Sequence, residues 1–167
     1  GRAWRGRGVK PDAPVTGKIR QALERQLEHV RNHPEEVYLT FMPRGIGLSV
    51  LSNDERHVTQ ARRRFMLLGQ TLAGMQVWDV RRCLQVARTL PGCDKATIEL
   101  WGRGGMASVV ALASLYEPFI GQLNLSQYPQ NDKEQPDYLN ISRIVTPKQI
   151  LSLAAMRAKV NLQEKKK

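Results

Sequence analysis

Residues 98–107 read IELWGRGGMA, and this stretch decides the fold. A short β-rich run, predicted as a strand over residues 96–101, leads into a glycine-dense turn over residues 102–105. Residues 106–116 follow without a linker; they are rich in Ala and Leu and apolar nearly all round, which is typical of a buried helix. The stretch therefore predicts a strand, a sharp turn and a helix in direct succession.

The segments on both sides of this stretch alternate between helix and strand. Helical periodicity covers residues 17–31 and 58–90, where Gly69 and Gly74 are weak points. Further predicted elements are a strand over 37–42, a strand over 119–125, a helix over 147–156 with Thr146 as its N-cap, and a strand over 159–162. This alternation predicts an α/β fold with a mostly parallel sheet and flanking helices.

The sheet is expected to begin with residues 37–42 and 96–101 as parallel strands. The helix over 58–90 would connect them in the right-handed sense. We expect the domain to span residues 18–162, after an irregular basic lead-in over 1–17 and before a basic tail over 163–167. The turn would then lie at the carboxyl edge of the sheet, with Gly104 in a strained or left-handed conformation.

Composition limits the classes of function. The chain has 167 residues, 41 % of them hydrophobic and 25 % charged, which is ordinary for one globular domain. No apolar run is long enough for a membrane span, and Cys83 and Cys93 fit no metal-binding spacing. The net charge of +11 keeps nucleic acid or another polyanion open as a partner, although only 6 % of residues are aromatic. No cofactor and no cellular compartment are indicated.

Two chemistries use a glycine-rich turn of this kind. An anion or a carbonyl group can bind backbone amides at a helix N-terminus, here those of Gly104 and Gly105. Alternatively, the turn is a nucleophile elbow, which presents one side chain between a strand and a helix. A dinucleotide site is disfavoured because Glu117, the acidic residue nearest the required spacing, ends the helix and does not follow a second strand.

Four stretches together resemble the α/β-hydrolase fold, most closely its acetyl xylan esterase and prolyl-oligopeptidase-like group. They are residues 37–47 with Arg44-Gly45, residues 78–82 with Asp79, the strand over 98–101 and the turn over 102–106. The resemblance covers residues 18–160, most specifically 37–125. It implies an incomplete hydrolase-like core that contains the fourth to seventh strands and lacks the third, with its oxyanion loop. It further implies an acyl-ester or carbohydrate ligand and, as a partner, the missing N-terminal part of a longer chain.

The chain departs from this family where the chemistry takes place. Gly104 occupies the position of the nucleophilic serine, and Ser108 lies inside the predicted helix, where we expect it to be buried. In this fold the base follows the nucleophile, but all three histidines precede it and are predicted to lie on the surface: His29, His33 and His57. The resemblance therefore implies carboxylic-ester hydrolase ancestry without an intact catalytic triad.

The acidic residues do not restore a triad. Asp132 and Asp137 lie in the predicted loop after the strand over 119–125, with no later histidine to orient. Asp79 is expected to pair along its own helix with Arg81 or Arg82.

The alternative function is a non-enzymatic binding module. A basic patch would then bind nucleic acid or another polyanion. Alternatively, the same residues form a solvated helix face without a binding function. The candidate patch consists of Arg62, Arg63, Arg64, Arg81 and Arg82.

Overall fold

A computed structural model describes residue 24 and residues 27–163. The chain divides into two compact units, Gly1–Thr40 and Phe41–Lys167, and each is described by itself. The predicted lead-in over 1–17 lies outside the described residues. So does the predicted tail, apart from Gln163, which ends the last strand.

The first unit contains a helix that the structure describes over residues 27–32. It ends as predicted next to Pro34, because proline disfavours the helical conformation in the residue before it. The amide of His33 donates to the carbonyl oxygen of His29 at 3.0 Å in this last turn. The remaining residues of the helix predicted over 17–31 lie outside the described residues, apart from residue 24, which is helical.

The strand predicted over residues 37–42 is wrong. The described sheet has three strands, and none of them includes these residues. Val37, Leu39 and Met42 are each more than half exposed. A strand forms only where a neighbouring strand completes its hydrogen-bond ladder, so β propensity alone does not make one. The predicted parallel pairing with residues 96–101, and the crossover between them, are wrong for the same reason.

The long helix predicted over 58–90 is two helices, α2 (Glu55–Leu67) and α3 (Leu72–Ala87). The break falls at Gly69, one of the two predicted weak points, which takes a φ of +68° that suits glycine. Thr71 then restarts the helix, because its hydroxyl accepts a hydrogen bond from the amide of Gly74 at 3.1 Å. A short 3-10 helix, η1 (Gly47–Ser49), precedes α2.

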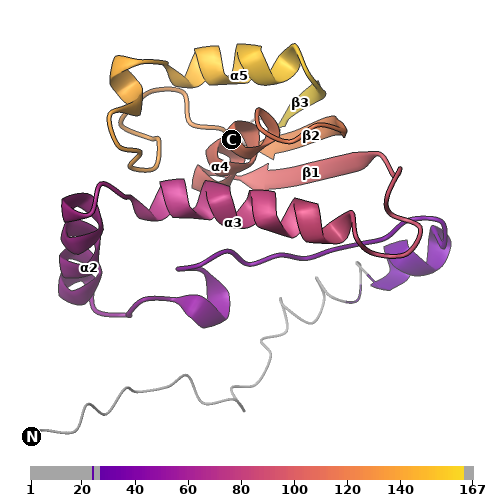
Figure 1. Ribbon diagram of the computed structural model, residues 1–167, viewed down its shortest axis with the longest axis horizontal. Coiled ribbons are helices and arrows are strands. Elements are labelled where there is room, and N and C mark those ends of the chain that lie inside the picture. The colour runs from indigo at the N-terminus through magenta and orange to yellow at the C-terminus, as the bar shows by residue number, and fades with distance from the viewer. Residues whose placement is uncertain (1–23, 25–26, 164–167) are drawn as a thin grey trace, which may run out of the picture. The chain divides into compact units, whose positions relative to one another are not determined.

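The sheet consists of β1 (Ile98–Arg103), β2 (Ile120–Ser126) and β3 (Lys159–Gln163), all parallel and in that order (Figure 1). These are the predicted strands over 96–101, 119–125 and 159–162, with small changes at the ends. The α/β fold with a parallel sheet is therefore confirmed. A second 3-10 helix, η2 (Ile141–Arg143), lies in the long connection after β2.

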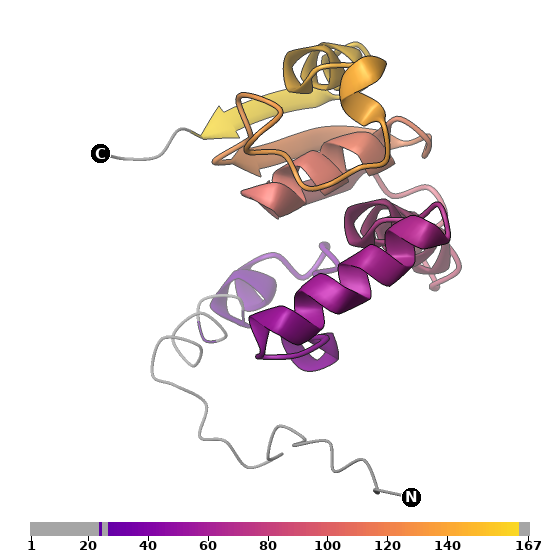
Figure 2. The same ribbon diagram turned by 90° about the vertical axis from the view of Figure 1, so that its left-hand side faces the viewer.

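One face of the sheet is covered by α4 (Gly105–Ser114) and α5 (Pro147–Ala155), which also contact each other. Figure 2 shows α4 lying across the sheet. All residues of α4 from Ala107 to Ser114 are buried, as its apolar sequence predicts, because α3 packs on its other side. α5 begins at the predicted N-cap, where Thr146 and Gln149 form a reciprocal capping box.

The opposite face of the sheet is polar and has no helix over it within the described residues. On β1 the exposed residues alternate with half-buried ones, so Glu99, Trp101 and Arg103 share this face. Polar side chains continue it onto the next strands. The side-chain Nδ2 of Asn124 donates to Glu99 at 3.3 Å, and its Oδ1 accepts from the side-chain Nδ2 of Asn161 at 2.9 Å. Parallel sheets are normally buried on both faces, so this uncovered face is unusual.

Candidate functional site

The candidate site is the turn between β1 and α4, at the carboxyl end of a parallel strand. Gly104 is the N-cap of α4, with φ 58° and ψ −129°. That conformation is strongly unfavourable for residues with a side chain, and glycine adopts it without steric penalty. The prediction of a strained or left-handed backbone at Gly104 is confirmed.

The neighbouring glycines allow the strand and the helix to lie close together. A Cβ atom on Gly102 would lie 2.9 Å from the Cα of Ala107 and 2.9 Å from the carbonyl oxygen of Met106. A Cβ on Gly105 would lie 3.1 Å from the Cγ of Pro136. A Cβ on Gly104 would meet nothing within 4 Å, so the turn has open space at the position where an elbow presents its side chain.

The backbone amides of the turn are not equivalent. The amide of Gly104 donates to the carbonyl oxygen of Ser126 at 2.9 Å and so continues the β1–β2 ladder past the end of the strand. The amide of Ala107 donates to the carbonyl of Gly104 at 3.0 Å. Of the predicted pair Gly104 and Gly105, only the amide of Gly105 lies at the first position of α4, where helix amides have no intrahelical acceptor.

Ser108 lies one turn into α4 and is fully buried, as predicted. Its hydroxyl oxygen accepts a hydrogen bond from the phenol of Tyr138 at 3.3 Å. Burial raises the pKa of Tyr138 well above its ordinary value, so this phenol stays protonated and donates. Ser108 is therefore a core residue that stabilises the segment after β2.

None of the histidines or of the predicted acidic residues Asp132 and Asp137 lies in a position to act as a general base at the turn. His29 and His33 belong to the first unit and have half-exposed side chains. His57 lies in the first turn of α2, where its Nδ1 lies 3.2 Å from Asp54 and its side chain is 73 % exposed. Asp132 and Asp137 are exposed in the loop after β2. Within the described residues, no histidine forms a hydrogen bond with the turn.

Asp79 has a partner that local spacing does not indicate. Its Oδ2 accepts from the Nε of Arg44 at 2.7 Å and from the backbone amide of Arg44 at 3.1 Å. The predicted pairing with Arg81 or Arg82 is therefore wrong, because Arg44 reaches α3 from 35 residues away. Burial raises the pKa of Asp79, but the hydrogen bonds and the charge of Arg44 outweigh it and hold the pKa below its ordinary value.

The segment around Arg44 is held to α3 by more than this ion pair. The side-chain amide of Gln76 donates to the backbone carbonyl of Arg44 at 2.9 Å. The guanidinium of Arg44 also lies 5.9 Å from the ring centroid of Trp78. Arg44 and Asp79 lie in separate sequence motifs, and nothing in their spacing indicates the contact.

The candidate polyanion patch is spread over two helices. Arg62, Arg63 and Arg64 are exposed on α2 and form no ion pair within the described residues. Successive helical residues point about 100° apart, so these three guanidiniums do not share one face.

The other two arginines of the patch lie on α3 and already have partners. The Nε of Arg81 donates to Glu117 at 2.8 Å. Arg82 donates to Gln85 at 2.6 Å and lies 4.9 Å from the ring centroid of Trp78. Their charge is therefore partly engaged within the second unit.

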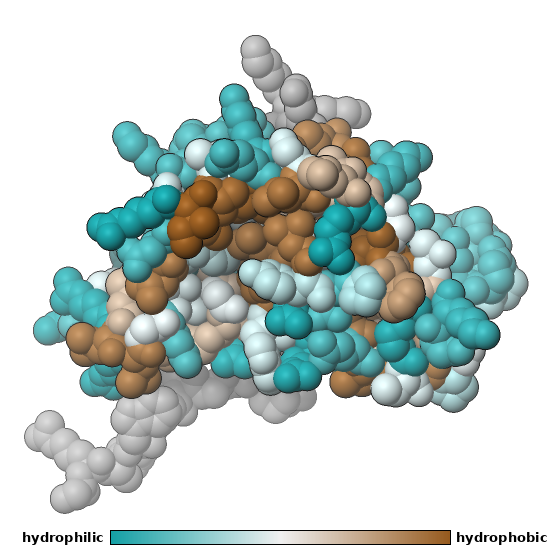
Figure 3. Space-filling view, turned by 45° about the horizontal axis from the view of Figure 1, so that its top comes forward, coloured by the Kyte–Doolittle hydropathy of each residue, from teal (hydrophilic) through white to brown (hydrophobic). Residues whose placement is uncertain are grey.

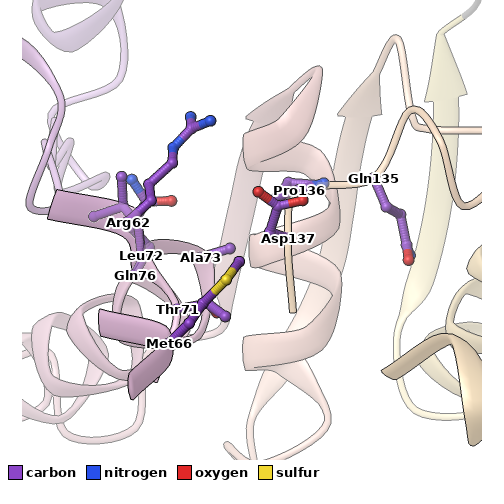
Figure 4. A pocket seen from close by; sticks show the side chains of 9 residues that line it. All are labelled: Arg62, Met66, Thr71, Leu72, Ala73, Gln76, Gln135, Pro136 and Asp137. Atoms are coloured by element: carbon purple, nitrogen blue, oxygen red, sulfur yellow. The ribbon is translucent and has the colours of Figure 1, made fainter. Parts of the chain in front are cut away.

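Two cavities lie between α3 and the loop that follows β2. The first has a volume of about 340 Å³, and Figure 4 shows Arg62 on one side of it and Asp137 on the other. In the same view, the side chain of Gln135 points away from this cavity. The second has a volume of about 650 Å³ and a mostly apolar lining that includes Trp78, Tyr138, Leu139, Ile141 and Ile144.

Apolar side chains are exposed over the same loop and over α5. Figure 3 shows hydrophobic residues gathered in a band across the face that it presents. Ile144 and Met156 are 81 % and 82 % exposed. Exposed apolar groups that gather in this way mark surfaces that contact other molecules or further protein.

Among the described residues, one group has side chains close enough to hold a metal ion: His33, Glu35 and Glu36. The two carboxylates are exposed, and Glu36 already accepts a hydrogen bond from His29 at 3.1 Å. The group contains nothing beyond ordinary surface ion pairs.

Comparison with known proteins gives no family for this chain. No family model matches it, and the searches of curated proteins and of solved structures found no match. None of the described helices is long and apolar enough to cross a membrane.

Proposed function

We propose that the chain is a segment of an α/β-hydrolase-like protein, with ancestry among carboxylic-ester esterases of the acetyl xylan type, and that it binds at its elbow without hydrolysis. The observation that carries this proposal is the backbone of Gly104, with φ 58° and ψ −129°, between a parallel strand and a buried helix. A nucleophile elbow requires this strained strand-to-helix turn. The resemblance places the missing serine at the same residue.

The contact between Arg44 and Asp79 gives independent support. These two residues belong to the other two stretches on which the resemblance rests, and they form a bidentate ion pair. Bidentate pairs between arginine and a carboxylate are geometrically specific. The contact therefore joins two of the stretches on which the resemblance rests, although residues 37–42 do not form the strand that it implies.

The turn has a backbone amide that can bind a ligand, but it has no nucleophile that could cleave an ester. A carbonyl oxygen or a small anion can approach the amide of Gly105 at the positive end of the α4 dipole, through the space that a side chain on residue 104 would fill. With no nucleophile at residue 104 and no histidine bonded to the turn, an ester would be held there intact. The ligand class that this chemistry suits is an acyl ester, free or attached to a carbohydrate.

Hydrolysis of p-nitrophenyl acetate by the purified chain is expected to equal the buffer background. The variant Gly104→Ser should also be inactive, because the members of a catalytic triad act as a unit and the serine would have no base. Release of p-nitrophenol is followed by absorbance, with heat-denatured protein as the control. Saturable turnover that a serine-directed inhibitor abolishes would contradict the proposal of a non-catalytic elbow.

Binding at the turn is tested by NMR titration of the ¹⁵N-labelled chain with acetate and with ethyl acetate. The amide of Gly105 should shift, whereas the amide of Gly92, in a distant turn, should not. The variant Gly104→Ala places a methyl group in the open space and should weaken the shift at Gly105. If neither probe moves the Gly105 amide, the turn does not bind the proposed ligand class.

The second candidate function is a polyanion-binding module, which is favoured by the exposure of Arg62, Arg63 and Arg64 on α2. If it holds, the logarithm of the affinity for single-stranded DNA should fall with the logarithm of salt concentration at a slope near −2, about −0.7 for each phosphate contact. Replacement of all three arginines by glutamine should flatten that slope. A matched change at Arg81 and Arg82, which have partners within the chain, should have less effect. Unchanged binding in the triple variant would exclude this patch.

A further inference from the structure

The strand β1 has one edge without a partner strand among the described residues. On its other edge, the amides of Ile98 and Gly104 donate to carbonyl groups of Phe119 and Ser126, at 3.4 and 2.9 Å. Backbone groups of a strand alternate in direction, so the even-numbered residues point to β2 and the odd-numbered ones point to the free edge. The free N–H and C=O groups therefore belong to Glu99, Trp101 and Arg103.

The side chains of the same three residues lie on the uncovered face of the sheet. All three are exposed, and Trp101 is 61 % exposed. Glu99 and Arg103 stand at equal distances along the strand on either side of Trp101, and their charges are opposite. Native sheets protect their edges with proline, bulges, charged side chains or very short strands. β1 contains no proline, its pairing irregularity lies at its start, between Ile98 and Glu99, and its two charges are opposite in sign.

We infer that two copies of this chain pair through β1, antiparallel and about a twofold axis at Trp101. In this register Glu99 of each copy lies opposite Arg103 of the other, and the two Trp101 side chains lie opposite each other. Opposite charges and aromatic pairs are the cross-strand neighbours that stabilise sheets. On the helix-covered face, Leu100 would lie opposite Gly102 of the second copy, where α4 of that copy packs close to the strand.

The same register uses every free backbone group of β1. The pairs formed by Glu99 with Arg103, by Trp101 with Trp101 and by Arg103 with Glu99 are each of the hydrogen-bonded kind, which exchanges both N–H···O bonds. A twofold axis at Leu100 or at Gly102 pairs fewer of these residues. In this register, the charges and the free backbone groups of β1 match those of a second β1. This self-complementarity favours a second copy over an unrelated partner. The inference does not depend on the proposed binding at Gly104, and it places a second copy at the edge where the resemblance would place the missing third strand.

Sedimentation velocity of the full chain over a range of concentrations tests this dimer. We expect a monomer–dimer equilibrium that Arg103→Glu weakens at least about tenfold, because it places like charges opposite each other twice. Glu99→Arg should weaken it similarly. The double variant, with Glu99→Arg and Arg103→Glu together, should restore it.

The matched control is Lys159→Glu, which makes the same charge change on the same face of the sheet but on β3. It should leave the equilibrium unchanged. Circular dichroism of each variant verifies that the fold is retained at these exposed positions. A chain that stays monomeric at every concentration would overturn the inference. So would a dimer that is indifferent to Arg103→Glu, or a double variant that fails to recover.

Discussion

Replacement of Gly102 by alanine is expected to lower the free energy of unfolding by about 3 kcal/mol, the upper part of the range for overpacking a close contact. The new Cβ would lie 2.9 Å from two backbone atoms of α4, those of Ala107 and Met106. Backbone atoms cannot swing aside as a flexible side chain does, so either α4 or β1 must shift. Urea denaturation followed by circular dichroism measures the loss.

Gly104→Ala is the matched control, two residues away. It adds the same methyl group where nothing lies within 4 Å, so only the strain of the φ of +58° opposes it. That strain costs about 1–3 kcal/mol, and the smaller conformational freedom of the unfolded chain offsets part of the cost. We expect a net loss of about 1 kcal/mol. Equal losses for the two variants would argue against the close approach of β1 and α4.

Replacement of Asp79 by alanine is expected to destabilise the second unit by about 2 kcal/mol, in the range for hydrogen bonds to a charged group. The Asp79 side chain is 11 % exposed, and it joins the segment around Arg44 to α3. Without it, Arg44 would keep only weaker contacts with Met75, Gln76 and Trp78. Thermal denaturation of Asp79→Ala should therefore show a lower Tm than that of the control Asp137→Ala, an exposed carboxylate in the same unit. Equal Tm values would show that the ion pair adds no stability.

The contribution of Asp79 should depend on pH in a defined direction. Its pKa is lowered in the folded chain and returns to the ordinary value, about 3.9, on unfolding. The stabilisation is therefore complete above about pH 4 and declines as the pH falls through the lowered pKa. The difference in unfolding free energy between the wild-type chain and Asp79→Asn should narrow in that acidic range. A difference that stays constant to lower pH would mean that the carboxylate charge is not what stabilises this contact.

The elements that the sequence predicts correctly are those whose signals lie within a few residues. The turn between β1 and α4 follows from its closely spaced glycines, and the start of α5 follows from Thr146 and Pro147. The burial of α4 follows from a composition that leaves no polar face. In each case backbone preference, capping or local hydrophobicity determines the conformation.

Contacts between residues far apart in the sequence were decided only by the tertiary structure. Residues 37–42 have the composition of a strand, yet they find no partner strand in the described sheet. Asp79 was expected to pair within its helix, yet Arg44 reaches it from 35 residues away, and the amide of Gly104 is used by Ser126. Whether a β-ladder forms, an ion pair forms or an amide stays free depends on which residue from elsewhere in the sequence lies beside it. The local sequence does not determine that residue.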